Sequence, residues 1–337
     1  MNESANFFCA SYADSISRTF LFNHLYNFLV NLMSISKFLS GKYEIIRLES
    51  STLRVDVAPA VGGKIISIYS KALSKEFLWT NDALELQSYP VGTSFDPFFF
   101  GGFDELLPCD LPEMIQGIDY PDHGELWTLD LNYDMNSNEL RLFKKLPLSE
   151  LYYEKIITLD ESEPLIHTDY NIRNDAPSVR NFLWKLHAAV NIQEGDQIAC
   201  FVGKAEVADT AYSRFNSLEP FTWPIIEDTD ASIIPAKNGT MDFFYLYEIQ
   251  KGEMSLISEK EDSKFAIIFD TKVFPYLWYF ASYGGFLDHY TAVLEPATTM
   301  PISVNDAIDL KQCSVLLPGE MIKTRVSVYA GSLNKKS

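Results

Sequence analysis

Short strand-like segments recur through most of this chain, and they limit its fold more than any other feature of the sequence. Each segment is rich in β-branched and aromatic residues and is bounded by Gly, Pro, Asn or Asp, which is typical of strands that end in turns. Because no long helical pattern separates them, they predict an all-β fold with antiparallel pairing, either a sandwich or a barrel. The clearest segments are YEIIRLE (43–49), LRVDVAP (53–59), KIISIYS (64–70), YYEKIITL (152–159), LIHTDYNIRN (165–174), FAIIFD (265–270), YLWYFA (276–281), YTAVLEP (290–296) and TRVSVYA (324–330).

The first forty residues differ from this pattern. The run RTFLFNHLYNFLVNLMSISKFL (18–39) has apolar residues at helical spacing, which favours an amphipathic helix. Asn and His residues interrupt the run, so it fits poorly as a transmembrane span or a signal peptide. We therefore predict an appendage over residues 1–40, which is either helical or not native, and one β-sandwich domain over residues 41–333, where no repeat or linker divides the chain.

The charge of the chain excludes several classes of partner. Its formal net charge is −19 and its isoelectric point is near 4.6, so it would repel a nucleic-acid backbone or an anionic membrane. A small neutral molecule is a better partner. The four cysteines (Cys9, Cys109, Cys200 and Cys313) are widely spaced without a CxxC motif, which indicates neither a metal site nor a disulfide scaffold. We predict no cofactor, no metal and a cytoplasmic location.

Two long connections, 80–122 and 208–240, interrupt the series of strands. Connections of this length in a compact domain are usually either functional or disordered. The first contains aromatic residues, paired glycines and acids, so we expect an ordered loop that lines a site. It leads into YPDHGELWTLDL (120–131), where His123 stands among turn-forming residues.

His187 lies in the apolar segment NFLWKLHAAVNI (181–192). As a strand, this segment places Leu183, Lys185 and His187 on one face and Trp184 and Leu186 on the other. A histidine in so apolar a strand needs a partner, because its burial without one is costly. Both a paired core histidine and a functional one fit this pattern.

Three carboxylates leave similar alternatives open. Glu295 ends the apolar strand YTAVLEP and is either a charge at the rim of the sheet or a carboxylate aimed into a cavity. Asp104 and Glu105 in GGFDELLP are either part of a solvated turn or a pair of acceptors for hydroxyl groups.

Several of these motifs occur together and in a fixed order. They resemble the galactose mutarotase-like (aldose 1-epimerase) superfamily, of which the chain looks like a divergent member, and the resemblance covers about residues 43–331. GGFDELLP and DHGELW are its most specific elements. The motifs in order are LRVDVAPAVGGKIISIYSKALSKEFLW, DPFFFGGFDELLPCDLP, YPDHGELWTLDL, FLWKLHAAV, YTAVLEPATTMPISVNDAI and LLPGE.

The resemblance implies an antiparallel β-supersandwich whose concave sheet face holds one sugar. Matched by motif, Glu295 is the general base that takes the proton of the anomeric hydroxyl. His187 is the general acid that protonates the ring oxygen, and His123 positions the sugar. Ring opening, rotation about the C1–C2 bond and closure then give the other anomer, without a metal. A base and an acid facing each other across the ring suit this chemistry.

Other residues are expected to bind the sugar. Asp104 and Glu105 would accept hydrogen bonds from hydroxyl groups, and Asp270 is the loosest match to an aspartate of the family. Trp184 and Trp278 could stack on sugar faces. Lys185, with Lys64, is a basic residue near the motifs, and the loop over 80–122 lacks the arginine found in the better-known galactose enzymes.

The sequence thus predicts an aldose 1-epimerase-type isomerase acting on a free monosaccharide. One alternative is a hexose-6-phosphate epimerase, for which few basic residues are at hand. A second alternative is a non-catalytic carbohydrate-binding protein, because Ala188 and Ala189 replace the usual aromatic residue after the histidine.

Overall fold

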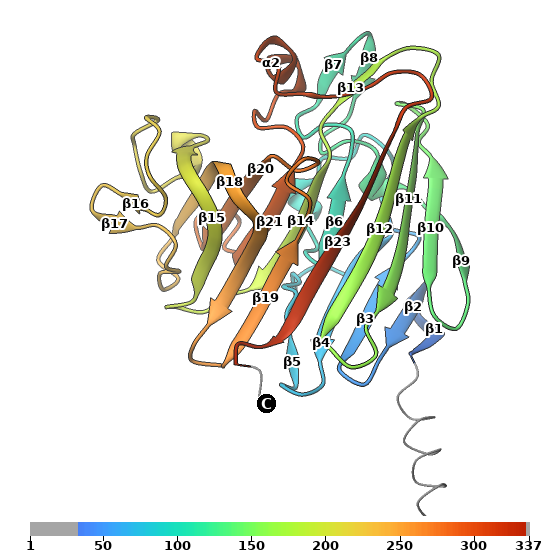
Figure 1. Ribbon diagram of the computed structural model, residues 1–337, viewed down its shortest axis with the longest axis horizontal. Coiled ribbons are helices and arrows are strands. Elements are labelled where there is room, and N and C mark those ends of the chain that lie inside the picture. Colours follow the sequence, from blue (N-terminus) through green and yellow to red (C-terminus); the bar gives the residue numbers. More distant parts are fainter. Residues whose placement is uncertain (1–32, 335–337) are drawn as a thin grey trace, which may run out of the picture.

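Antiparallel strands make up nearly the whole fold. The computed structural model describes residues 33–334 (Figure 1). The short helices are η1 (Asp96–Phe98), η2 (Leu126–Thr128), η3 (Thr210–Tyr212) and α2 (Val304–Asp309). The strands are β1 (Ser34–Ser40), β2 (Tyr43–Glu49), β3 (Leu53–Ala58), β4 (Lys64–Ser70), β5 (Lys75–Glu76), β6 (Phe103–Leu106), β7 (Glu113–Ile115), β8 (Ile118–Tyr120), β9 (Asn132–Met135), β10 (Leu140–Lys145), β11 (Leu151–Leu159), β12 (Leu165–Asn174), β13 (Arg180–Phe182), β14 (Lys185–Asn191), β15 (Gln197–Val207), β16 (Ile225–Ile226), β17 (Thr229–Asp230), β18 (Thr240–Ser258), β19 (Ser263–Ile268), β20 (Tyr276–Tyr283), β21 (Tyr290–Ala297), β22 (Ser314–Leu316) and β23 (Met321–Ser332).

Two layers of strands are joined into one continuous ladder. In the rear layer of Figure 1, pairing runs from β1 through β2, β3, β4, β6, β14, β21 and β20 to β18. In the front layer it continues from β19 through β23, β12, β11 and β10 to β9. The long strand β18 connects the layers, because its first half pairs with β20 and its second half with β19.

The main core lies between the two layers. In strand β11 the side chains alternate strictly between buried and half-buried positions, because successive side chains of a strand point to opposite faces. One face of β11 therefore packs into the core. In the rear layer, β14, β20 and β21 are buried on both faces. Their outer face is covered by the connections on either side of β6 and by the connection that leads to β18, and the candidate site lies under these connections.

The predicted all-β, antiparallel fold is confirmed, and each of the nine predicted segments forms a strand or most of one. One boundary differs from the prediction. Residues 34–40, assigned to the appendage, form β1, which pairs with β2 over its whole length. Most of its side chains are exposed, so its sequence carries little of the apolar alternation that marks the other strands. The end of the run 18–39, predicted as helical, is therefore strand, and its residues 18–32 lie outside the described residues.

Candidate active site

Five side chains from five neighbouring strands form one row across the outer face of the rear layer. Strand register pairs His187 with Asp104, Glu295 with Trp278, and Trp278 with Tyr245. The register of β14 with β21 sets His187 opposite Glu295. Because side chains at paired positions lie on the same face, the predicted acid and base stand on adjacent strands and face the same space.

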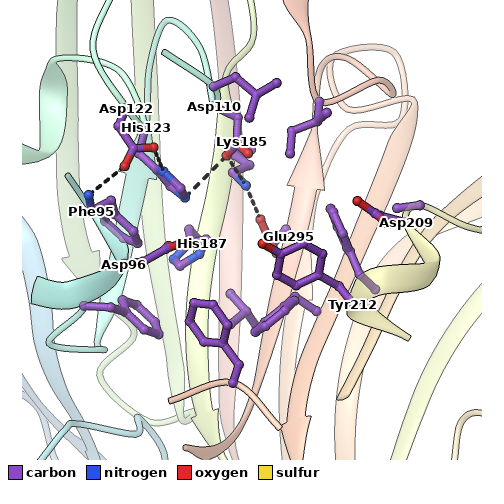
Figure 2. Close-up of a pocket in the computed structure, with 18 of the residues that line it drawn as sticks. Phe95, Asp96, Asp110, Asp122, His123, Lys185, His187, Asp209, Tyr212 and Glu295 are labelled. Carbon is purple, nitrogen blue, oxygen red and sulfur yellow. Dashed lines mark hydrogen bonds and ion pairs between the residues drawn. The ribbon is translucent and has the colours of Figure 1, made fainter. Parts of the chain in front are cut away.

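Three members of this row, His187, Glu295 and Tyr245, line a cavity of about 430 Å³, a volume in the range of small-molecule sites. Figure 2 shows His123 and His187 on one side of this cavity and Glu295 on the other, with Lys185 between them. The walls come largely from the two long connections, as expected of the first. The lining residues are Phe95, Asp96, Phe99, Asp110, Leu111, Asp122, His123, Lys185, His187, Ala208, Asp209, Tyr212, Phe243, Tyr245, Phe280, Phe286, Val293, Glu295 and Ile302.

Lys185 links two buried carboxylates at the centre of the cavity. Its Nζ lies 2.7 Å from Glu295 Oε2 and 2.6 Å from Asp110 Oδ1, and 4.3 Å from the centre of the Trp278 ring. Burial alone would lower the pKa of Lys185, but Asp110 and Glu295 outweigh it and raise this pKa. Burial raises the pKa of Glu295 against the opposing attraction of Lys185. Glu295 is therefore a desolvated carboxylate held by a fixed ammonium group.

His123 stands in a turn whose backbone geometry is unusual. Its φ is +58°, a value that costs a bulky residue on the order of 1 kcal/mol. The following Gly124 has φ +72°, and a Cβ there would lie 2.2 Å from Leu107 O. The backbone N–H of His123 donates to Asp110 O at 2.6 Å. The turn thus fixes the imidazole at the edge of the cavity.

Two carboxylates hold the His123 ring. Nδ1 lies 2.8 Å from Asp122 Oδ1, Nε2 lies 3.6 Å from Asp110 Oδ1, and the ring stacks on Phe95 with centres 4.0 Å apart. Burial would lower the pKa of His123, but Asp110 and Asp122 outweigh it and raise this pKa. His123 thus joins Asp122, Asp110, Lys185 and Glu295 in a string of alternating charges (Figure 2).

His187 has a different environment. Its ring meets the edges of Phe95 and Phe99, with centres 5.6 and 5.3 Å apart. Within residues 33–334, its buried Nδ1 has no hydrogen-bond partner. Burial and the positive charge of Lys185 lower the pKa of His187 well below its usual value. The imidazole is therefore neutral, and its ring lines the cavity while its Nδ1 stays buried.

Asp104 and Glu105 do not reach the cavity, although strand β6 carries both. The Asp104 carboxylate lies beside His187 but pairs with Lys64 at 2.8 Å. Glu105 points to the core between the layers, where Lys155 Nζ approaches its two oxygens at 2.8 and 2.7 Å and Tyr170 donates at 2.6 Å. Each carboxylate neutralises a buried lysine rather than accepting from a ligand.

Of the three other residues predicted to contact the sugar, Trp278 lies next to a residue of the cavity, and Trp184 and Asp270 lie away from it. Trp184 is fully buried in the core, against Phe274, on the opposite face of the sheet from His187. Trp278 is also fully buried, but it lies in the row beneath Lys185 and donates to Thr299 O. Asp270 is exposed and accepts the N–H of Lys272 in a turn away from the cavity. Neither Trp184 nor Asp270 lines the site.

Asp96 and Asp110 were not singled out from the sequence, although both line the cavity. Both belong to the motif DPFFFGGFDELLPCDLP, and membership of this motif is the one sequence feature that could indicate them. A loop residue has no strand period to indicate where its side chain points. Asp110 is identified only by its contacts with Lys185 and the backbone of His123.

Comparisons with known proteins agree with this architecture. No curated protein matches the chain. A family model described as a domain of unknown function matches residues 22–120. A galactose mutarotase-like protein from Clostridium acetobutylicum superposes with a TM-score of 0.67 at 14% identity, over 89% of this chain and 99% of the other. This chain has a galactose mutarotase-like fold.

Two further solved structures share the galactose mutarotase-like fold. A galactose mutarotase related enzyme from Lactobacillus acidophilus has a TM-score of 0.66 at 13% identity, covering 86% of this chain and 98% of its own. A galactose mutarotase-like protein from Lactobacillus casei has a TM-score of 0.63 at 15% identity, covering 85% and 100%. At this level of identity the likeness concerns the fold.

Residues 33–334 hold neither a membrane-spanning helix nor a metal-binding cluster of side chains. None of their helices has the length and apolar character needed to cross a membrane. No group of three or more His, Cys, Asp or Glu side chains in this range is arranged to hold a metal ion. Cys109, Cys200 and Cys313 are unpaired within the same range.

Proposed function

We propose that this protein interconverts the anomers of a free aldose by acid–base opening and closure of the sugar ring. The observation that carries the proposal is the pairing of Glu295 and His187 on adjacent strands, in a cavity large enough for one sugar. The galactose mutarotase-like fold supports it. A small neutral sugar as the partner and a cytoplasmic location are part of the same proposal.

Glu295 acts as the base. Its carboxylate takes the proton of the anomeric hydroxyl while the bond between C1 and the ring oxygen breaks, giving the open aldehyde. Lys185, 2.7 Å away, holds the carboxylate in place and favours its ionised form. Asp110 completes the support of Lys185 from the other side. Positioned acids and bases of this kind contribute about 10²–10⁴-fold each.

His187 acts on the ring oxygen, to which its protonated form gives a proton. Its lowered pKa makes the imidazolium a strong acid but a minor species at neutral pH. The proposal therefore predicts a rate that rises as the pH falls from 8 towards 6. Closure after rotation about C1–C2 reverses both transfers and restores the site. His123, whose ring is committed to Asp122 and Asp110, positions the sugar and supports Asp110.

The test is anomer exchange of several aldoses, measured by NMR saturation transfer with the wild type, His187→Asn and His167→Asn. His167 serves as a matched control, because it lies on β12 outside the cavity and contacts Ser327. We expect faster exchange of at least one sugar, a loss of about 10²–10⁴-fold in His187→Asn and little change in His167→Asn. Sugar binding without faster exchange would instead indicate a non-catalytic binding protein.

A further inference from the structure

The charges around the cavity define the class of sugar that it accepts. We infer that the substrate is an uncharged aldose whose hydroxyl groups are recognised by Asp96, and that sugars bearing a phosphate are excluded. This inference rests on the proposed function and concerns the same cavity. It is drawn from the distribution of lining charges and from the surroundings of Asp96.

Carboxylates outnumber cations among the lining residues. The acids are Asp96, Asp110, Asp122, Asp209 and Glu295, and the basic groups other than the neutral His187 are Lys185 and His123. Both basic groups are already engaged: Lys185 contacts two carboxylates, and His123 lies between two. A phosphate recognised by proteins normally meets Arg or Lys donors that can turn to it. No lining group within residues 33–334 offers such a free cation.

Asp96 is the lining carboxylate best placed to receive a sugar hydroxyl. Its side chain is half-buried and has no hydrogen-bond or ion-pair partner among the described residues. Figure 2 shows it between His123 and His187, on the opposite side of the cavity from Glu295. Burial raises the pKa of Asp96, because the ionised carboxylate loses hydration that no hydrogen-bond donor of the described residues replaces. Donation from hydroxyl groups of a bound sugar would offset that cost.

The backbone holds Asp96 in place before any ligand binds. Asp96 begins η1, and Pro97 follows it in the first turn. Phe95 N–H donates to Asp122 Oδ2 at 2.8 Å, which ties this helix to the turn that carries His123. Phe99 N–H donates to Asp96 O at 3.3 Å. A fixed acceptor of this kind rejects analogues that lack the matching hydroxyl, because the polar group is then left unpaired.

The first arm of the test compares Asp96→Asn with the wild type on the sugar that the wild type accelerates most. We expect KM to rise about 10–100-fold, in line with hydrogen bonds to a charged group, while kcat stays within about threefold. Asp82→Asn is the control, since Asp82 is exposed in the same connection and does not line the cavity. An unchanged KM in Asp96→Asn would overturn the assignment of Asp96.

The second arm uses monodeoxy analogues and the 6-phosphate of the same sugar. We expect one deoxy analogue to be a poorer substrate for the wild type and to lose this disadvantage in Asp96→Asn. We expect the 6-phosphate to be neither accelerated nor able to compete with the free sugar. Faster exchange of the phosphate would overturn the inferred substrate class.

Failure of the proposed function gives a different result. If no aldose exchanges faster with the wild type, the enzymatic proposal fails, and ligand-observed NMR binding of the same sugars then tests Asp96 alone. Weaker binding in Asp96→Asn than in Asp82→Asn supports the recognition role. Equal binding in the two variants, or no binding of any neutral sugar, overturns it.

Discussion

At the scale of single residues, the period of the strand explains what could be predicted. Alternation placed Lys185 and His187 on one face, and both line the cavity. The same alternation set Trp184 on the other face, and the structure buries it in the core, so its predicted contact with a sugar is wrong. Strand alternation predicts the face on which a side chain lies, but it does not predict which residue that side chain contacts. The contact of Lys185 with Asp110 depends on a loop that is remote in sequence.

The two histidines of the cavity should change the free energy of unfolding in opposite directions as the pH falls, because their pKa values are shifted in opposite directions. The pKa of His187 is lowered in the folded protein, so between that value and the unfolded value of about 6.5 the unfolded state binds more protons. Stability from this residue is therefore complete above about pH 6.5 and falls as the pH decreases, by up to about 1.4 kcal/mol per unit. His187→Asn should remove this dependence.

Urea unfolding of the wild type and His187→Asn between pH 5 and pH 8 measures the effect. The difference in free energy of unfolding between the two should shift in favour of the variant as the pH falls below about 6.5. His123, whose pKa is shifted in the opposite direction, is present in both proteins and contributes to both curves. A constant difference over the whole range would contradict the environment described for His187.

At the scale of elements, strand β6 carries two carboxylates whose partners could not be predicted from the sequence. The four residues of this strand send Asp104 to the outer face and Glu105 to the core, and each carboxylate meets a buried lysine. From the sequence, both resembled acceptors for sugar hydroxyls. Lys64 and Lys155 lie on β4 and β11, far from β6 in the chain, so the pairing follows from the order of strands rather than from any local motif. Neither carboxylate lines the cavity.

The Glu105–Lys155 pair should be critical for stability, since both side chains are fully buried. Lys155→Met leaves an uncompensated carboxylate in the core and should destabilise the protein by about 3–5 kcal/mol. Adding Glu105→Gln should recover part of this loss, because a neutral amide can still accept from Tyr170. Denaturant unfolding measures both variants.

An exposed lysine provides the comparison for this prediction. Lys145 pairs with Glu150 at 2.9 Å, and both side chains are well exposed, so Lys145→Met should cost at most about 1 kcal/mol. Equal losses of unfolding free energy in Lys155→Met and Lys145→Met would contradict the importance of the buried pair for stability. A double variant Lys155→Met, Glu105→Gln as unstable as Lys155→Met alone would also contradict it.

At the scale of the whole molecule, the fold was predictable and the cavity was predictable only in part. Turn residues and β-rich segments indicate the antiparallel sandwich, and the structure confirms it. The cavity draws on β14, β18, β20 and β21 and on both long connections. Its principal residues therefore come from distant parts of the chain. Motif order located His123, His187 and Glu295, whereas Asp96 and Asp110 required the folded arrangement.

The proposed anomer exchange depends on Glu295 as the base. The most direct test is the anomer exchange rate of the best sugar with the wild type, Glu295→Gln and Glu219→Gln, where Glu219 is an exposed glutamate outside the cavity. We expect the exchange rate to fall about 10²–10⁴-fold in Glu295→Gln and to equal the wild-type rate in Glu219→Gln. A wild-type rate in Glu295→Gln would contradict this role of Glu295.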